Sequence, residues 1–293
     1  MKELTVLCPA KINLTLAVTG KTADGYHEIK SIMQTVSLYD EVTVAVGGSY
    51  INLQTDLPYI PRDRRNIAYK AAEAFFAAVG ATYGVRISIK KHIPVSAGLA
   101  GGSADGAGVL YALNRLFGSP LDQKALCDLA TPIGADVPFC MEGGTRLATG
   151  IGEKLQRLPD MPRSYIVIAK PQGGLSAAEV YKAFDAAPPP PPADTAAAIR
   201  ALEKKDVAAL ASCLGNALEP AAVGMLPQVA EVKEDLGAYL PLKALMSGSG
   251  SSVFAVFNDE EAAKKCLEGV RKKYRAAFLV RPTTAGVREK RPE

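Results

Sequence analysis

The sequence contains no tryptophan, and its aromatic content is only 6%. No apolar run approaches the roughly 20 residues that a membrane-spanning helix needs. An acidic residue, Glu3, lies close to the N-terminus, and no hydrophobic region of a signal peptide follows it. We therefore expect a cytoplasmic protein.

The number and spacing of the cysteines argue against a disulfide-stabilised protein and against a structural zinc site. The five cysteines are an odd number, lie far apart along the chain and include no Cys-x-x-Cys pair. This spacing provides neither a disulfide framework nor a structural zinc site. We expect free, buried or half-buried thiols at all five positions, which are Cys8, Cys127, Cys140, Cys213 and Cys266.

The charge balance is mild, with a net charge of +4. Part of it lies at the C-terminal end, where Arg288, Lys290 and Arg291 form a small basic tail. This charge suits an anionic small molecule as substrate but is too weak to indicate a nucleic acid as partner.

Familiar nucleotide-binding signatures are also missing. No Gly-x4-Gly-Lys-Ser/Thr segment occurs, so the chain is not a P-loop NTPase, and the His-Arg-Asp and Asp-Phe-Gly motifs of protein kinases are absent. Gly106-x-Gly108 alone is a weak match to a dinucleotide fingerprint.

The 293 residues favour two domains over one. Strands adjoin strands in the first half, which favours mixed helix and sheet with mostly antiparallel pairing. Val42–Val46 and Tyr50–Leu53 flank Gly47-Gly48 and predict a hairpin, whereas Asn66 predicts the N-cap of a helix. The proline run Pro188–Pro192 predicts an extended connector.

A glycine-rich segment between Ile93 and Gly108 follows a predicted strand and opens a predicted helix. Glycines let the backbone approach phosphate oxygens, and a helix N-terminus offers unpaired N–H groups with a partial positive charge. Ser103 could cap this helix or meet a phosphate or metal, and Lys91 could add a point charge. We therefore predict a phosphate-binding loop rather than a turn formed only for packing.

Three further segments carry chemistry-bearing residues whose function is ambiguous in isolation. Lys11 and Asn13 share one face of a strand, although a lysine in such a pattern is, taken alone, more often a surface residue. Asp136 lies among small and apolar residues and needs a partner, although it could be a structural N-cap. The glycine-serine segment 246–253 could be a flexible hairpin.

In this order, the four segments resemble the motifs of the GHMP small-molecule kinases. Pro9-Ala-Lys-Ile-Asn13 resembles the first motif, the Pro94–Ala104 loop the second and Ser247-Gly-Ser-Gly250 the third. Asp24-Gly-Tyr-His-Glu28, Gln34–Asp40 and Gly134–Phe139 are most similar to the branch that acts on 4-diphosphocytidyl-2-C-methyl-D-erythritol. The resemblance covers nearly the whole chain.

The resemblance implies an α+β fold of two domains. The N-terminal domain, at 1–158, would bind ATP and be similar to ribosomal protein S5 domain 2. The C-terminal domain, at 159–283, would be ferredoxin-like, and 284–293 would be the basic tail. The reaction would transfer the γ-phosphoryl group of ATP to the 2-hydroxyl of the methylerythritol moiety, in the non-mevalonate isoprenoid pathway. Magnesium is expected with ATP, and the chain would be a monomer or weak homodimer.

The resemblance also implies roles for individual residues. Asp136 would accept the hydroxyl proton, and Lys11 would stabilise charge at the attacking oxygen. Substrate would be bound by Asn13, by Tyr26 and His27 at its cytidine end, and by Tyr181 on the other face of the base. ATP would contact Asn66, Lys91, Pro94, Val95, Ser96, Ala97, Gly98, Leu99, Ala100, Gly101, Gly102, Ser103 and Ala104. No residue is predicted as a metal ligand beyond the candidate Ser103.

The chain departs from the family pattern at Ser96, Ala97 and Ala100, where glycine is common. A Cβ at Ala97 would restrict how closely the backbone approaches a phosphate. Two other functions stay open: a kinase of the same superfamily acting on homoserine or mevalonate, and a nucleotide-binding regulator without catalysis. Tyr26 and His27 argue against the first, because those substrates carry no base. The presence of Lys11 and Asp136 argues against the second.

Overall fold

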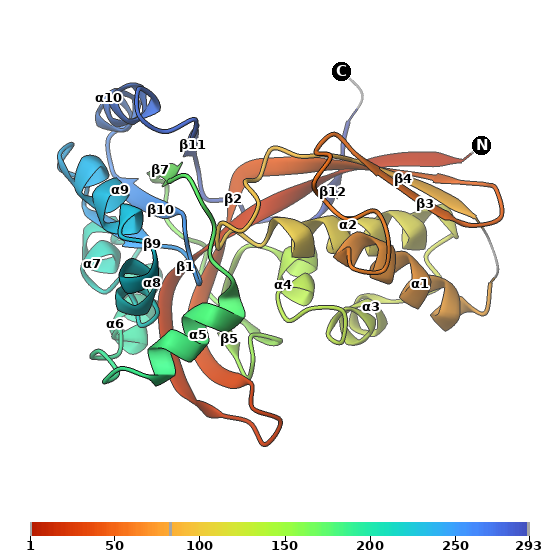
Figure 1. The fold of residues 1–293 in the computed structure, drawn as a ribbon, viewed down its shortest axis with the longest axis horizontal. Helices are drawn as coiled ribbons and strands as arrows, with labels where there is room; N and C mark the ends of the chain where they lie inside the picture. Colours follow the sequence, from red (N-terminus) through yellow and green to blue (C-terminus); the bar gives the residue numbers. More distant parts are fainter. Residues whose placement is uncertain (1, 82–83, 292–293) are drawn as a thin grey trace.

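The computed structural model describes residues 2–81 and 84–291. Met1, 82–83 and 292–293 fall within the predicted domain and tail ranges and lie outside the described residues. The described strands form an eight-stranded sheet and a four-stranded sheet, each covered by helices (Figure 1). No helix among the described residues is both long enough and apolar enough to cross a membrane.

The first sheet is built around a long antiparallel hairpin of β1 and β2, which in Figure 1 runs from the region of α1 and α2 to a tip beyond α5. Its strand order is β12-β1-β2-β4-β3. In addition, β5 pairs with β2, β6 pairs with β5, and β8 pairs with β1. The strands are β1 Glu3–Lys21, β2 His27–Val46, β3 Ile51–Thr55, β4 Val85–Lys90, β5 Thr145–Thr149, β6 Lys154–Arg157, β8 Gly215–Asn216 and β12 Arg288–Glu289.

Strand β1 is buried on both faces from Cys8 to Ala17. One face carries Ile12 and Leu14, which belong to the core below the helices. The opposite face carries Lys11 and Asn13, and they are buried as well. Burial of a polar face indicates that further structure covers it, and this is where the two halves of the chain meet.

Helices cover one face of the first sheet, and their apolar sides bury residues such as Phe75, Ile87 and Leu110. They are α1 Ile67–Val79, α2 Gly101–Leu116, α3 Gln123–Ala130 and α4 Val137–Glu142. The predicted N-cap is confirmed, because Asn66 Oδ1 accepts from Ala68 N at 2.9 Å. At the other end of α1, Gly80 adopts the left-handed conformation that glycine tolerates best.

The second sheet is entirely antiparallel, in the order β11-β7-β10-β9. Its strands are β7 Tyr165–Lys170, β9 Lys243–Met246, β10 Val253–Phe257 and β11 Ala276–Val280. The remaining helices are α5 Ala177–Asp185, α6 Thr195–Glu203, α7 Val207–Ser212, α8 Glu219–Met225, α9 Gln228–Gly237 and α10 Glu260–Arg271. Residues 188–192 form no helix or strand, as their proline content predicts.

Two sequence-based expectations are wrong. Residues on either side of Gly47-Gly48 do not form a hairpin, because β4 lies between β2 and β3 and pairs with both. The C-terminal stretch is not a free tail, since β12 pairs with β1 and Val287 is buried. Both errors arise from pairing partners that are distant in sequence.

The predicted division at residue 158 falls between β6 of the first sheet and β7 of the second. Two short strands on the far side of that division return to the first sheet, β8 and β12. After residue 158 the chain therefore passes from the second sheet to the first at β8, returns to the second sheet at β9, and ends in the first sheet at β12.

Candidate active site

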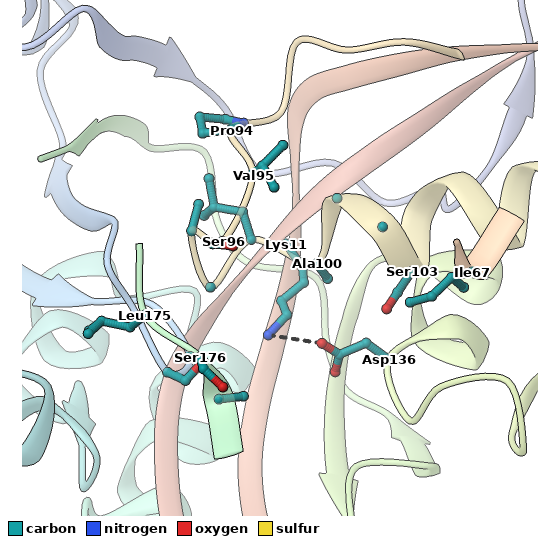
Figure 2. A pocket seen from close by; sticks show the side chains of 18 of the residues that line it. Lys11, Ile67, Pro94, Val95, Ser96, Ala100, Ser103, Asp136, Leu175 and Ser176 are labelled. Carbon is teal, nitrogen blue, oxygen red and sulfur yellow. Dashed lines mark ion pairs between the residues drawn. The ribbon is translucent and has the colours of Figure 1, made fainter. Parts of the chain in front are cut away.

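A pocket of about 800 Å³ lies where the glycine-rich loop, the polar face of β1 and the start of α5 meet (Figure 2). Lys11 and Asn13 line it from β1, and Asp136 lines it from the turn before α4. The predicted phosphate loop contributes every residue from Pro94 to Ser103, whereas Ala104 is buried in the core. The pocket brings together residues from all four motifs that the sequence singled out.

The phosphate loop combines tight turns with an uncapped helix start. Ser96, Gly98 and Ala100 all have positive φ angles, of 51°, 71° and 58°. Such angles cost a non-glycine residue roughly 1–2 kcal/mol, so the loop stores strain at Ser96 and Ala100. Ala100 is the N-cap of α2 and makes no side-chain capping bond. Within the described part of the chain, the N-cap side chain of α2 thus accepts none of the first N–H groups of the helix, which lie beside the pocket.

Ser103 lies inside the first turn of α2 rather than at its cap, so the capping role predicted for it is wrong. The sequence predicts that the Cβ of Ala97 restricts the approach of the backbone to a phosphate. In the structure, Ala97 is only 3% exposed and belongs to the hydrophobic core. Its Cβ therefore packs into the protein.

The glycine-serine turn holds the phosphate loop from the second sheet. Ser247 Oγ donates to Gly98 O at 2.9 Å, and Ser252 N donates to Ala97 O at 3.1 Å. A Cβ placed on Gly98 would come within 2.0 Å of Ser247 O, so only glycine fits this approach. The turn is therefore not a free hairpin tip but a clamp that fixes the loop.

The ammonium of Lys11 and the carboxylate of Asp136 face each other across the pocket, with Nζ 3.4 Å from Oδ2 (Figure 2). The Lys11 side chain is 5% exposed and that of Asp136 is 30% exposed. Asp136 occupies the N-cap position of α4 but makes no capping bond. Its carboxylate is thus directed to a buried cation and to the pocket, and the structural N-cap alternative is not realised.

Asn13 completes this arrangement from the same strand face. Its Oδ1 accepts from Lys11 Nζ at 2.8 Å, and its Nδ2 donates to Ser31 Oγ at 2.8 Å. Ser31 Oγ in turn donates to Thr15 O at 2.5 Å. This chain of bonds fixes both the amide and the ammonium, so the cation is held in place before any ligand arrives.

Lys91 lines the pocket, but its charge is committed to the protein. Its ammonium pairs with Asp40 and lies 2.7 Å from Asp105 Oδ2, and its side chain is 4% exposed. Burial opposes the charge, but Asp105 and Asp40 outweigh this effect and raise the pKa of Lys91. A free point charge for phosphate, as predicted, is therefore not what this side chain provides. Sequence reasoning missed both carboxylates, although Asp105 lies within the glycine-rich segment itself.

Comparison with known proteins identifies the family. The model described as "GHMP kinases N terminal domain" matches residues 66–144, and that described as "GHMP kinases C terminal" matches residues 198–276. A protein of Pelotomaculum thermopropionicum named 4-diphosphocytidyl-2-C-methyl-D-erythritol kinase is 46% identical over 89% of this chain and 92% of its own. The chain belongs to this family of GHMP kinases.

Solved structures agree with this assignment. A crystal structure of 4-(cytidine 5'-diphospho)-2C-methyl-D-erythritol kinase is 34% identical, covers 95% of this chain and 99% of its own, and has a TM-score of 0.78. A homoserine kinase from Cytophaga hutchinsonii has a TM-score of 0.77 at 22% identity, with 99% and 98% covered, and shows the fold alone. The predicted α+β fold of the GHMP kinases is confirmed.

In this GHMP kinase, in contrast to the prediction from the sequence, His27 and Tyr181 do not lie on opposite faces of a space for the cytosine base. His27 and Tyr181 stack directly on each other, with ring centroids 4.5 Å apart and an interplanar angle of 22°. That separation leaves no room for a base between them. Tyr181 lines the pocket, whereas Tyr26 is 64% exposed and is the last residue of the turn before β2. The two rings thus form one stacked wall, of which Tyr181 but not His27 lines the pocket, rather than the two faces of a sandwich.

The remaining predicted ATP contact in this kinase, Asn66, also lines the pocket. Its side chain is already used twice, because Oδ1 caps α1 and Nδ2 donates to Pro61 O at 2.8 Å. Asn66 therefore shapes the pocket wall by fixing the start of α1.

Proposed function

We propose that this chain is an ATP-dependent kinase that phosphorylates the 2-hydroxyl of 4-diphosphocytidyl-2-C-methyl-D-erythritol. The observation that carries the proposal is the Lys11–Asp136 pair in one pocket with the phosphate loop Pro94–Ser103. An acceptor hydroxyl beside Asp136 then lies within reach of a phosphoryl group held by the loop. The curated relatives carry the same activity in their names.

The chemistry follows from these positions. The 2-hydroxyl oxygen forms a bond to the γ-phosphorus while the bond from that phosphorus to the β,γ-bridging oxygen breaks, and ADP leaves. Asp136 accepts the hydroxyl proton. Lys11 stabilises the negative charge that develops on the attacking oxygen, and Asn13 holds the ammonium at 2.8 Å in that position.

ATP occupies the loop side of the pocket in this proposal. Its phosphates meet the N–H groups at the start of α2, and the base end lies toward Asn66 and Ile67. No group of three or more His, Cys, Asp or Glu side chains is arranged to hold a metal among the described residues. Mg²⁺ would arrive with the ATP phosphates, and Ser103 would be a nearby oxygen donor. Magnesium would neutralise charge on the β- and γ-phosphates.

The cytidine end of the substrate is placed at the wall formed by His27 and Tyr181. A base stacks on an aromatic face, and the exposed Tyr26 at the hairpin tip is available to cover the base from the other side. We propose a catalytic unit that is a monomer or weak homodimer. We place the reaction in the cytoplasm, where ATP is supplied.

An ADP-release assay tests the function. Purified protein with ATP and Mg²⁺ is expected to form ADP when the cytidylylated methylerythritol is added, and not with homoserine or mevalonate. Turnover of either of those compounds without turnover of the cytidyl compound would overturn the choice of substrate. ATP binding without turnover of any of the three alcohols would instead indicate a nucleotide-binding regulator.

A further inference from the structure

Asp185, the last residue of α5, joins the two ends of the β1–β2 hairpin turn. Its Oδ1 lies 2.8 Å from His27 Nε2, and its Oδ2 lies 2.7 Å from Lys21 Nζ. Lys21 ends β1, His27 begins β2, and the two residues are paired in the sheet. One carboxylate thus contacts both strands beside the hairpin tip. Sequence reasoning gave Asp185 no role.

Helix α5 holds His27 with two residues on one of its faces. Tyr181 and Asp185 are four positions apart, so they lie one turn apart on the same side of the helix. Tyr181 stacks on the imidazole ring at 4.5 Å, while Asp185 binds its Nε2 edge. The ring is therefore fixed in its plane and in its rotation, and its side chain is only 11% exposed.

The contact also fixes which ring nitrogen carries hydrogen. Hydrogen bonds from Lys21 and His27 hold the pKa of Asp185 below its usual range, so the carboxylate is ionised near neutral pH. A carboxylate only accepts, so His27 Nε2 must donate. In the neutral ring, Nδ1 is then the acceptor, a defined hydrogen-bonding edge for whatever meets the ring.

We propose that Asp185 is a positioning residue for the nucleoside end of the substrate, acting through His27 and supported by Lys21. This inference rests on the proposed function, in which the His27–Tyr181 wall receives the cytosine. Without Asp185, the imidazole can rotate and change tautomer, and the base loses a preformed wall. The reacting groups Lys11 and Asp136 belong to other elements and keep their geometry, so the effect falls on binding of the nucleoside rather than on phosphoryl transfer.

Steady-state kinetics test the inference by comparing Asp185→Asn with a matched control, Asp128→Asn. Asp128 is an exposed carboxylate of α3 that pairs with Lys124 at 2.5 Å and does not line the pocket. For Asp185→Asn we expect the KM for the cytidyl substrate to rise roughly three- to tenfold, as for loss of a partly exposed ion pair. Both kcat and the KM for ATP should stay within about twofold of wild type, and the control should match wild type. An unchanged KM, or a loss confined to kcat, would overturn the inference.

Calorimetry with CDP as the probe, in the presence of saturating ADP, separates this inference from the proposed function. Weaker CDP binding by Asp185→Asn supports the inference even where wild type fails to phosphorylate the cytidyl substrate, and the proposed function alone then fails. Equal CDP affinity in the two proteins overturns the inference, while turnover by wild type keeps the proposed function. Absence of CDP binding by wild type overturns the inference, whereas turnover of the cytidyl substrate by wild type still decides the proposed function.

Two further measurements guard against a variant that fails to fold. Lys21→Met keeps the bond from His27 to Asp185 and is expected to raise the same KM by only about twofold. The chain has two histidines, so the imidazole nitrogen signals can be assigned with His92→Gln. Wild-type His27 should show the Nε2-protonated form, and Asp185→Ala a mixture of tautomers. Identical His27 signals in wild type and Asp185→Ala would overturn the inference.

Discussion

Lys11 Nζ lies 3.4 Å from Asp136 Oδ2, although one residue sits in the first strand and the other in the turn before α4. The pair is asymmetric in exposure, since the ammonium is almost fully buried and the carboxylate is open to the pocket. A buried cation beside an accessible carboxylate leaves Asp136 free to contact a ligand, while Lys11 stays in place through Asn13. This asymmetry is what a proton acceptor with a fixed electrostatic partner requires.

Asp136→Asn is expected to lower kcat by about 10²–10⁴-fold, because an amide cannot accept the hydroxyl proton. ATP affinity and thermal stability should change little, since the side chain is 30% exposed and the phosphate loop does not depend on it. Single-turnover kinetics and a separate ATP titration measure the two effects. Retention of wild-type kcat would remove Asp136 from the mechanism, and equal loss of ATP binding would point to a structural role instead.

Gly98→Ala is expected to weaken ATP binding by at least tenfold and to lower stability. A Cβ at this position would stand 2.0 Å from Ser247 O, and φ is +71°, so both the clamp and the loop must move. Gly224→Ala is the matched control, because it lies in α8 with nothing within 4 Å of the added Cβ. That control should keep activity and gain about 0.5–1 kcal/mol of stability. ATP titration measures the affinity of each variant, and thermal unfolding measures its stability. Equal ATP affinity and equal stability of the two variants would contradict the role of the Ser247 turn as a clamp on the loop.

Local patterns predicted much of this site. Strand alternation placed Lys11 and Asn13 on one face, and the glycine-rich segment marked the loop that opens α2. Those features depend on neighbours within a few residues, which is why the sequence carries them. The expectation that all four motifs serve one kinase fold came from the resemblance, since spacing alone left each motif open.

Other features depend on partners that are distant in sequence. β4 inserts between β2 and β3 in place of the expected hairpin, and β12 returns to the first strand. Lys91 follows β4 and contacts Asp40 of β2 and Asp105 of α2, so its burial could not be predicted from its own segment. Likewise, stacking of Tyr181 on His27 depends on how α5 packs against the hairpin.

Tyr181→Phe and Tyr181→Ala should separate the ring from its hydroxyl. Burial, with a smaller contribution from Asp136, raises the pKa of Tyr181 to about 12, so the phenol stays protonated throughout the neutral range. Tyr181→Phe should therefore leave the pH profile of kcat unchanged and alter the KM for the cytidyl substrate by less than about threefold. Tyr181→Ala removes the stacking surface worth about 0.5–1.5 kcal/mol beyond area burial and should raise that KM by roughly tenfold or more. A Phe variant as impaired as the Ala variant would assign the role to the hydroxyl.

Asp105→Asn is expected to cost much less stability than Asp40→Asn. Asp40 accepts from His92 N at 2.5 Å and Ile93 N at 2.8 Å as well as from Lys91, whereas Asp105 Oδ1 is buried without a partner among the described residues. Burial, together with the charge of Asp40, raises the pKa of the Asp105 carboxyl well above its usual range. A neutral amide therefore resembles the protonated form of the carboxyl, which burial favours over the charged form. Loss of the Asp40 charge breaks a buried network and should cost about 3–5 kcal/mol.

The raised pKa of Asp105 also determines whether folding stability rises or falls with pH. Because the pKa of Asp105 is raised in the folded protein, the folded state binds a proton there at pH values at which the unfolded chain, with its ordinary pKa of about 3.9, has already released it. The wild type should then lose stability as pH rises from that value toward the raised folded pKa, and Asp105→Asn should lack this component. Thermal unfolding of wild type, Asp105→Asn and Asp40→Asn between about pH 5 and 9 measures the slopes. If Asp105→Asn shows the wild-type slope, the proton resides elsewhere in the cluster, and Asp40 would then have to carry it despite its backbone donors.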